Sequence, residues 1–218
     1  MKVINLTLVL WTLLSFTARA ATLAPIVDQE ALGATLSEIA LPATIARDLT
    51  SGFENRLLIR VLLISQTESI ARADAMVTVK YDLWEERYIV RRILGGRVID
   101  ESVVKQVQDA AKALSTLRLD RLFLLSSLPK ERDLTLQAEL LINPIERDKL
   151  DRLREWVATN SAPRDAVGGG AAFTPRPNDL FNRIFEQYTS GADVAAPWRL
   201  TVVSQPFRPA RLRGDAGE

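Results

Sequence analysis

Most of the side chains that enzymes use for catalysis and for metal binding are missing from this chain, which contains no histidine and no cysteine. Without histidine there is no Ser-His-Asp triad, and there is no imidazole to act as a general base or as a zinc ligand. Without cysteine there is no thiol nucleophile, no thiolate metal site and no disulfide. The sequence therefore predicts no transition-metal site, no cofactor and no catalytic residue of these kinds.

One short motif resembles a nucleophile site. Ser127-Leu128-Pro129-Lys130 has the spacing of serine–lysine acyl enzymes, in which one helical turn places the amine beside the hydroxyl. Here Pro129 stands between the two residues, and no Lys-Thr-Gly partner follows in the chain. We therefore interpret the motif as a loop that follows a core segment.

Two further groups of residues could act in a site. Asp82, Glu85 and Glu86 could supply the carboxylate pair of a glycosidase, but such a group also forms an ordinary solvated turn, and it lacks the alternating pattern of a calcium loop. Gly168 to Gly170 lack the Lys-Ser/Thr and the flanking elements of a phosphate-binding loop. We interpret the first group as a turn and the second as part of a linker, and we keep an atypical carboxylate hydrolase as an alternative.

The first twenty residues have the pattern of a secretory signal peptide. Lys2 precedes an apolar run over residues 3–16, and Ala18-Arg19-Ala20 is a small-x-small cleavage site. We expect cleavage after Ala20 and a periplasmic or secreted protein without an integral membrane span. Losing Lys2 and Arg19 changes the net charge from +1 to −1, which gives no long-range attraction for nucleic acid.

The rest of the chain predicts a mixture of strands and helices. Residues 55–65 are nearly continuously apolar and predict a strand covered on both faces, and 133–142 alternate as a half-exposed strand does. Gly95-Gly96 predicts a tight hairpin, because both glycines can take positive φ. Further strands are expected over residues 34–41, 75–83, 87–94, 97–99 and 197–204, a loop over 66–71, a strand or loop over 121–125 and a short helix over 43–51.

Two amphipathic helices are expected to cover the sheet. The first spans 101–118, with Asp100 or Ser102 as its cap and apolar residues recurring every three or four positions. The second spans 144–159, with Asn143 as its cap and Pro144 at its first position. A third helix is expected over 179–189, with its apolar residues on one face. These residues are candidates for partner binding: Phe181, Ile184, Phe185 and Tyr188.

These elements predict the organisation of the chain. We expect a signal peptide over 1–20, an α+β domain over 21–160, a flexible linker over 161–177, a C-terminal helix and strand over 178–204, and a disordered tail over 205–218. The C-terminal helix is expected to dock on its own domain or on a partner. Trp84, at a turn between two strands, is a second candidate for partner binding, since aromatic side chains anchor interfaces.

The element order over residues 55–160 resembles that of an uncharacterised family of small exported proteobacterial proteins. The features that carry the resemblance are a strand, a meander containing Tyr81-Asp82-Leu83-Trp84, an amphipathic helix, a strand and a capped helix. The resemblance covers about half of the chain. It implies a location in the cell envelope and carries no known activity.

The sequence thus predicts an α+β fold, with an antiparallel sheet that is either open or folded into a sandwich and is covered by the two helices. An all-β sandwich with peripheral helices is the alternative fold. The expected function is that of a non-enzymatic envelope binding or scaffold protein, which would have a solid core and an exposed aromatic patch. A lipid carrier would instead show a closed apolar cavity lined by Leu58, Leu62 and Val107, and a hydrolase would show two facing carboxylates. The sequence does not predict the oligomeric state.

Overall fold

Six long antiparallel strands form the central sheet of the protein, for which a computed structural model describes residues 20–160, 189–190 and 194–212. The order across this sheet is β12-β8-β3-β4-β5-β6. The strands are β3 (Asn55–Ser65), β4 (Glu68–Asp82), β5 (Arg87–Leu94), β6 (Arg97–Val104), β8 (Leu134–Ile142) and β12 (Trp198–Val203). The expected signal peptide, linker and C-terminal helix fall almost wholly outside the described residues.

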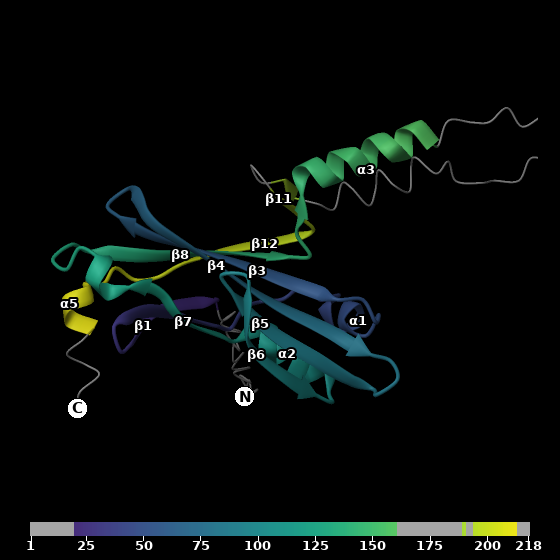
Figure 1. The fold of residues 1–218 in the computed structure, drawn as a ribbon, viewed down its shortest axis with the longest axis horizontal. Coiled ribbons are helices and arrows are strands. Elements are labelled where there is room, and N and C mark those ends of the chain that lie inside the picture. Colours follow the sequence, from purple (N-terminus) through teal and green to yellow (C-terminus); the bar gives the residue numbers. More distant parts are fainter. Residues whose placement is uncertain (1–19, 161–188, 191–193, 213–218) are drawn as a thin grey trace, which may run out of the picture.

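A second sheet packs against one face of the first. It has the order β1-β2-β7, with β1 (Thr22–Asp28), β2 (Ala31–Ser37) and β7 (Leu117–Leu124). Figure 1 shows β1 and β7 lying along one side of the long strands. Side chains of both sheets belong to a single apolar core. From β3 it contains every second residue, namely Leu57, Ile59, Val61 and Leu63, all fully buried. Burying a side chain of this size contributes about 1.5–3 kcal/mol.

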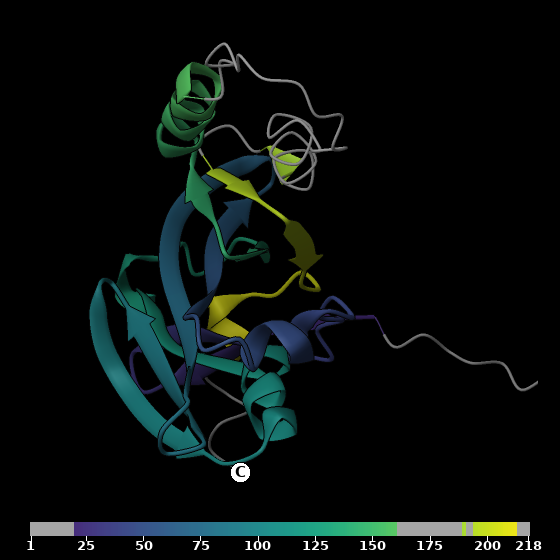
Figure 2. The ribbon, with the colours of Figure 1, turned by 90° about the vertical axis from the view of Figure 1, so that its right-hand side faces the viewer.

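Two short helices complete this core at one end. They are α1 (Ile45–Leu49) and α2 (Val107–Ser115), and Figure 2 shows them side by side within the curve of the large sheet. Ile45 and Leu49 of α1 and Ala110 and Leu114 of α2 are buried in the core. Helix α1 is followed by Gly52 at φ +80°, a left-handed conformation that glycine takes without strain.

The other face of the large sheet carries a smaller layer. Strands β9 (Ile145–Glu146), β10 (Thr189–Ser190) and β11 (Val194–Ala196) form a short sheet with the order β10-β11-β9. Helix α3 (Arg147–Asn160) continues from β9 and lies on the far side of this layer from β1 and β7 (Figure 1). Leu141 and Leu58 of the large sheet contact Val194 and Ala196 here.

The structure confirms a fold made mostly of antiparallel sheet, as a mainly-β or α+β protein, but the two expected cover helices differ from expectation. Residues 97–104 form one strand, so the expected caps Asp100 and Ser102 lie in β6, and the helix begins at Val107. The strand continues to Val104 because its backbone pairs with β5 as far as Tyr88, and Asp100 and Glu101 also form ion pairs with Arg92 and Arg91 on β5, at 3.3 and 2.6 Å.

The second cover helix is also placed differently. Asn143 has φ +47°, a conformation that suits a turn and not a helix cap, and residues 145–146 form strand β9 before α3 begins. Leu150 packs with Ala195 and Ile145 in the small layer, whereas Leu153 is 44% exposed. Helix α3 therefore contacts the small sheet and does not cover the main core.

Several element boundaries differ from the sequence prediction. The strand expected over 34–41 is β2, which forms a hairpin with β1, a strand that the sequence reading missed. Residues 66–71 are not a loop, because β4 begins at Glu68 after a two-residue turn, and β7 starts four residues before the expected 121. By contrast, β3 and β5 begin and end where expected, β8 begins one residue later, and Gly95 and Gly96 take φ values of +56° and +79° in the expected hairpin.

Residues 205–212, which the sequence places in a disordered tail, make defined contacts with the large sheet. Phe207 forms a β-bridge with Leu134, with two backbone hydrogen bonds of 2.8 Å. Arg208 donates hydrogen bonds to Asp133, and a short helix, α5 (Pro209–Leu212), follows. The expected disordered tail is therefore wrong for residues 205–212, because these contacts hold them against the start of β8.

Candidate functional site

Trp84 is the described residue that best fits the partner-binding prediction. It lies in the turn between β4 and β5 and is 96% exposed. The four other candidates lie outside the described residues: Phe181, Ile184, Phe185 and Tyr188. Trp84 is thus the one predicted site residue within the described part of the chain, and a site around it has to be built from its own neighbours.

The turn that carries Trp84 is fixed by a carboxylate. Asp82 Oδ1 accepts hydrogen bonds from the backbone N–H groups of Trp84 (3.0 Å) and Glu85 (3.2 Å). Such bonds from an aspartate to the backbone two and three residues ahead stabilise a turn. Glu86 then takes φ +48° and leads the chain into β5. One of the three candidate carboxylates thus has a structural role, and it holds Trp84 in a defined position.

A second exposed aromatic residue, Phe53, lies in the loop between α1 and β3 and is 78% exposed. The buried side chain of Asn55 holds this loop: its Nδ2 donates to the carbonyl oxygens of Asp48 (2.9 Å) and Phe53 (3.3 Å). The Phe53 N–H in turn donates to Ser51 Oγ at 3.3 Å. Phe53 is therefore presented to solvent by a hydrogen-bonded loop.

The two loops touch through Gly52 and Leu83. A Cβ atom placed on Gly52 would lie 3.2 Å from Leu83 Cδ1, so the leucine side chain lies directly over the glycine. Leu83 is itself 64% exposed. Phe53, Leu83 and Trp84 thus lie at the same end of the large sheet, and we call these three residues the aromatic tip. The β4–β5 turn and the start of β3 are at the α1 end of the molecule in Figure 1.

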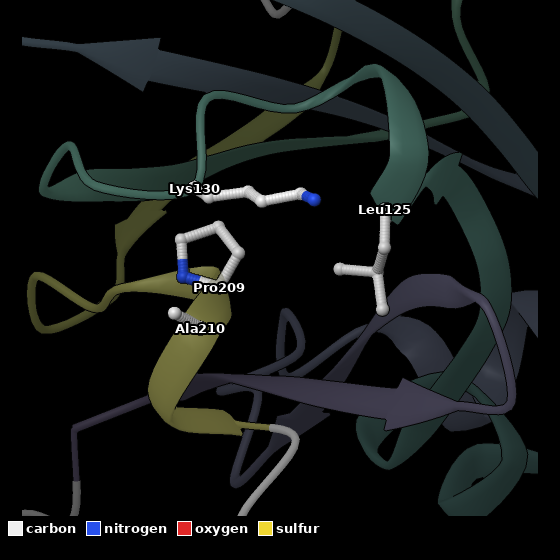
Figure 3. A pocket seen from close by; sticks show the side chains of 4 residues that line it. All are labelled: Leu125, Lys130, Pro209 and Ala210. Carbon is white, nitrogen blue, oxygen red and sulfur yellow. The ribbon is translucent and has the colours of Figure 1, made fainter.

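The residues of the serine–lysine motif lie elsewhere and do not form a nucleophile site. Ser127 Oγ donates a hydrogen bond of 2.7 Å to the Leu124 carbonyl. Lys130 extends along a hollow of about 190 Å³ that is also lined by Leu125, Pro209 and Ala210, as Figure 3 shows. This hollow contains no second polar side chain among its described lining residues, which supports our interpretation of the motif as a loop.

The apolar cavity expected of a lipid carrier does not form from the residues that we named for it. Val107 packs against the main core, whereas Leu58 lies on the opposite face of the large sheet, with Leu141 and Val194. Leu58 lines an open hollow of about 370 Å³ together with Arg60, Pro144, Glu146 and Val194. Glu139 forms ion pairs with Arg60, which lines this hollow, at 3.7 Å and with Arg199 at 3.1 Å.

The described part of the chain contains no candidate cluster of metal ligands and no candidate membrane-spanning helix. Within those residues, no three acidic side chains converge as a metal site requires. No described helix is both long and apolar enough to cross a bilayer. Comparison with family models, with curated proteins and with solved structures finds no match.

Of the residues around this candidate site, the sequence singles out Trp84 but not Phe53, Leu83 or Asn55. Leu83 is the last residue of the strand expected over 75–83, in which it continues the alternation of Val77, Val79 and Tyr81. The strand ends at Asp82, and the leucine turns outward. For Phe53 the available signal was its place after Ser51-Gly52, which marks a loop, but no local pattern shows that this loop meets the β4–β5 turn.

Proposed function

We propose that this protein is a non-enzymatic binding or scaffold protein that recognises another protein through the aromatic tip. The observation that carries the proposal is the exposure of three large apolar side chains, 96% for Trp84, 78% for Phe53 and 64% for Leu83, at one end of the molecule. Aromatic side chains dominate the binding energy of protein interfaces, and leaving several of them together in water is unfavourable.

The rigidity of the two loops supports this proposal. Asp82 and Asn55 fix the backbone on either side of the tip, so little conformational freedom remains to be lost when a partner binds. The packed core supports a binding protein over a carrier, since the side chains of both sheets and both helices fill one apolar cluster. Asp82, as part of the turn, is occupied with backbone N–H groups and supports no hydrolytic role.

The proposed location is the periplasm or the extracellular space, after cleavage behind Ala20. The pattern of Lys2, the apolar run and Ala18-x-Ala20 supports export. Mass spectrometry of the protein purified from its own cells should find Ala21 at the N-terminus. An intact Met1 in the purified protein would contradict the proposed export.

Site-specific photocrosslinking tests the binding proposal. Benzoylphenylalanine replaces Phe53 in the full chain, produced in the cells from which the protein comes, and irradiation should give a discrete adduct with another protein. The adduct should be lost in Trp84→Ala, which should change the free energy of unfolding by less than about 0.5 kcal/mol because the side chain is exposed.

The control position is Leu124, which is 65% exposed at the end of β7 in the other sheet. Benzoylphenylalanine at this position should not give the same adduct. The proposed function fails if position 53 gives no adduct, if positions 53 and 124 give the same one, or if Trp84→Ala leaves it unchanged.

A further inference from the structure

Negative charge lies next to the aromatic tip. Glu85 and Glu86 follow Trp84 directly, both are exposed, and within the described part of the chain neither takes part in an ion pair. On the other loop, Glu54 is held by Arg56 at 2.7 Å. The two glutamates of the turn are therefore the carboxylates at the tip that are available to a partner.

Positive charge lies further back, on the strands. Arg87 is directly opposite Asp82 in the register of β4 and β5, and Lys80 is opposite Ile89, two residues before Asp82. Asp82 and Arg87 are cross-strand neighbours of opposite charge and offset each other. Lys80 lies on β4, and Lys105 follows the end of β6, where Val104 is opposite Tyr88. Glu85 and Glu86 instead follow Trp84 directly in the turn, so the charge next to Trp84 is negative.

This charge distribution discriminates between the surfaces that could cover the tip. In a two-fold contact whose axis passes through the aromatic tip, Glu85 and Glu86 of the two copies would come close together, and like charges would repel. An anionic bilayer would repel them in the same way. A protein surface with an apolar recess bordered by lysine or arginine would satisfy both the aromatic side chains and the carboxylates.

From this geometry we infer that the partner of the aromatic tip is a different protein, whose surface combines an apolar recess with a border of lysine or arginine side chains. Trp84 and Phe53 fill the recess, and Glu85 and Glu86 pair with the basic border. This inference rests on the proposed function, because it specifies the partner of the same surface. The acidic border acts mainly on the rate of association and on its dependence on salt.

Charge reversal tests this inference in the photocrosslinking assay at position 53. In Glu85→Lys/Glu86→Lys the yield of the adduct should fall at least about fivefold, and in the unchanged protein it should fall as the salt concentration is raised. The matched control is Glu30→Lys/Glu68→Lys, which changes the net charge by the same amount. Both control residues are exposed; Glu30 lies between β1 and β2, and Glu68 follows the end of β3 farthest from Asn55.

The outcomes separate this inference from the proposed function. An adduct that requires Trp84 but survives the reversal of Glu85 and Glu86, or falls equally in the control, overturns the basic border while the proposed function stands. An adduct between two copies of this chain overturns the inference. So does Trp84-dependent binding of the purified protein to phosphatidylglycerol vesicles that exceeds its binding to phosphatidylcholine vesicles. Absence of any adduct at position 53 removes the proposed function, and the inference with it.

Discussion

Replacing Asn55 with alanine should destabilise the protein by about 2–4 kcal/mol, because this buried side chain connects three segments. Its Nδ2 donates to the Asp48 carbonyl at the end of α1 and to the Phe53 carbonyl, and its Oδ1 accepts from Asn143 Nδ2 at 3.1 Å. Asn143 in turn binds the backbone of Arg56 through its Oδ1 and its own N–H, at 2.8 and 2.7 Å.

The magnitude follows from counting these bonds. Three hydrogen bonds at about 1 kcal/mol each give roughly 3 kcal/mol. The Asp48 carbonyl also accepts from Ser51 Oγ at 2.6 Å and stays satisfied without Asn55, which lowers the cost. The part-buried Asn143 Nδ2 loses its hydrogen-bond acceptor in Asn55→Ala, which raises the cost of the substitution. For a chain of this size the change corresponds to a decrease in Tm of about 5–15 °C.

Urea unfolding followed by circular dichroism measures this effect. Gln108→Ala is the control, since it removes an amide that is exposed on α2 and should change the free energy of unfolding by less than about 0.5 kcal/mol. A cycle of Asn55→Ala and Asn143→Ala should give a coupling energy of about 1 kcal/mol. If Asn55→Ala changes stability no more than the control does, or if the two asparagines are additive, the reasoning is refuted.

Three other predictions concern packing, pH and the C-terminal segment. Gly33→Ala should cost at least about 2 kcal/mol in a urea titration, because its Cβ would lie 2.4 Å from the Leu119 carbonyl oxygen, whereas Gly95→Asn in an open turn should be nearly neutral. Burial, and to a smaller extent the neighbouring Tyr81, raises the pKa of Tyr88 above its ordinary value of 10.0. The contribution of Tyr88 to stability is therefore complete below pH 10.0 and is lost as the pH rises through the higher folded pKa. Tyr88→Phe should remove this part of the loss of stability at alkaline pH, and an unchanged loss would contradict the assignment. Truncation at Asp165 removes β12 and should lower the free energy of unfolding by several kcal/mol. Docking of the expected C-terminal helix is therefore better tested with β12 retained, by serine substitution of its apolar residues, namely Phe181, Ile184, Phe185 and Tyr188. The docking prediction fails if these substitutions change neither the stability nor the amount of a co-purifying partner.

Elements with a strong local signal could be predicted from the sequence. The alternation of β8 and the Gly95-Gly96 hairpin depend on residues that are adjacent in the chain, and the structure has both. The helix expected over 101–118 forms only over 107–115, because Val103 and Val107 fit a helical spacing although they belong to different elements. A signal for the longer strand was present: two arginines before the hairpin and two acidic residues after it, which pair across the strands.

The candidate site could be predicted only in part, because it is assembled from segments distant in sequence. Trp84 follows from its place in a turn, which the polar residues around it indicate. Its neighbourhood depends on the contact of Gly52 with Leu83 and on the hydrogen bond between Asn55 and Asn143, which are 88 residues apart. Asn143 was expected to be a helix cap, and only the long-range pairing of β3 with β8 shows its actual role.

The free edge of the large sheet offers a competing place for association, and its residues argue against it. Among the described residues, strand β6 pairs only with β5, and it exposes Val98, Ile99 and Val103 by 51–56%. A register shift near Arg92 interrupts the ladder, and half-exposed carboxylates, those of Asp100 and Glu101, lie along it. Irregular pairing and charged side chains of this kind hinder the addition of another strand. The aromatic tip lies in loops and not at a strand edge, and hydrogen bonds of the Asp82 and Asn55 side chains hold the backbone of these loops. Of these two exposed apolar surfaces, the tip is therefore the one suited to specific binding.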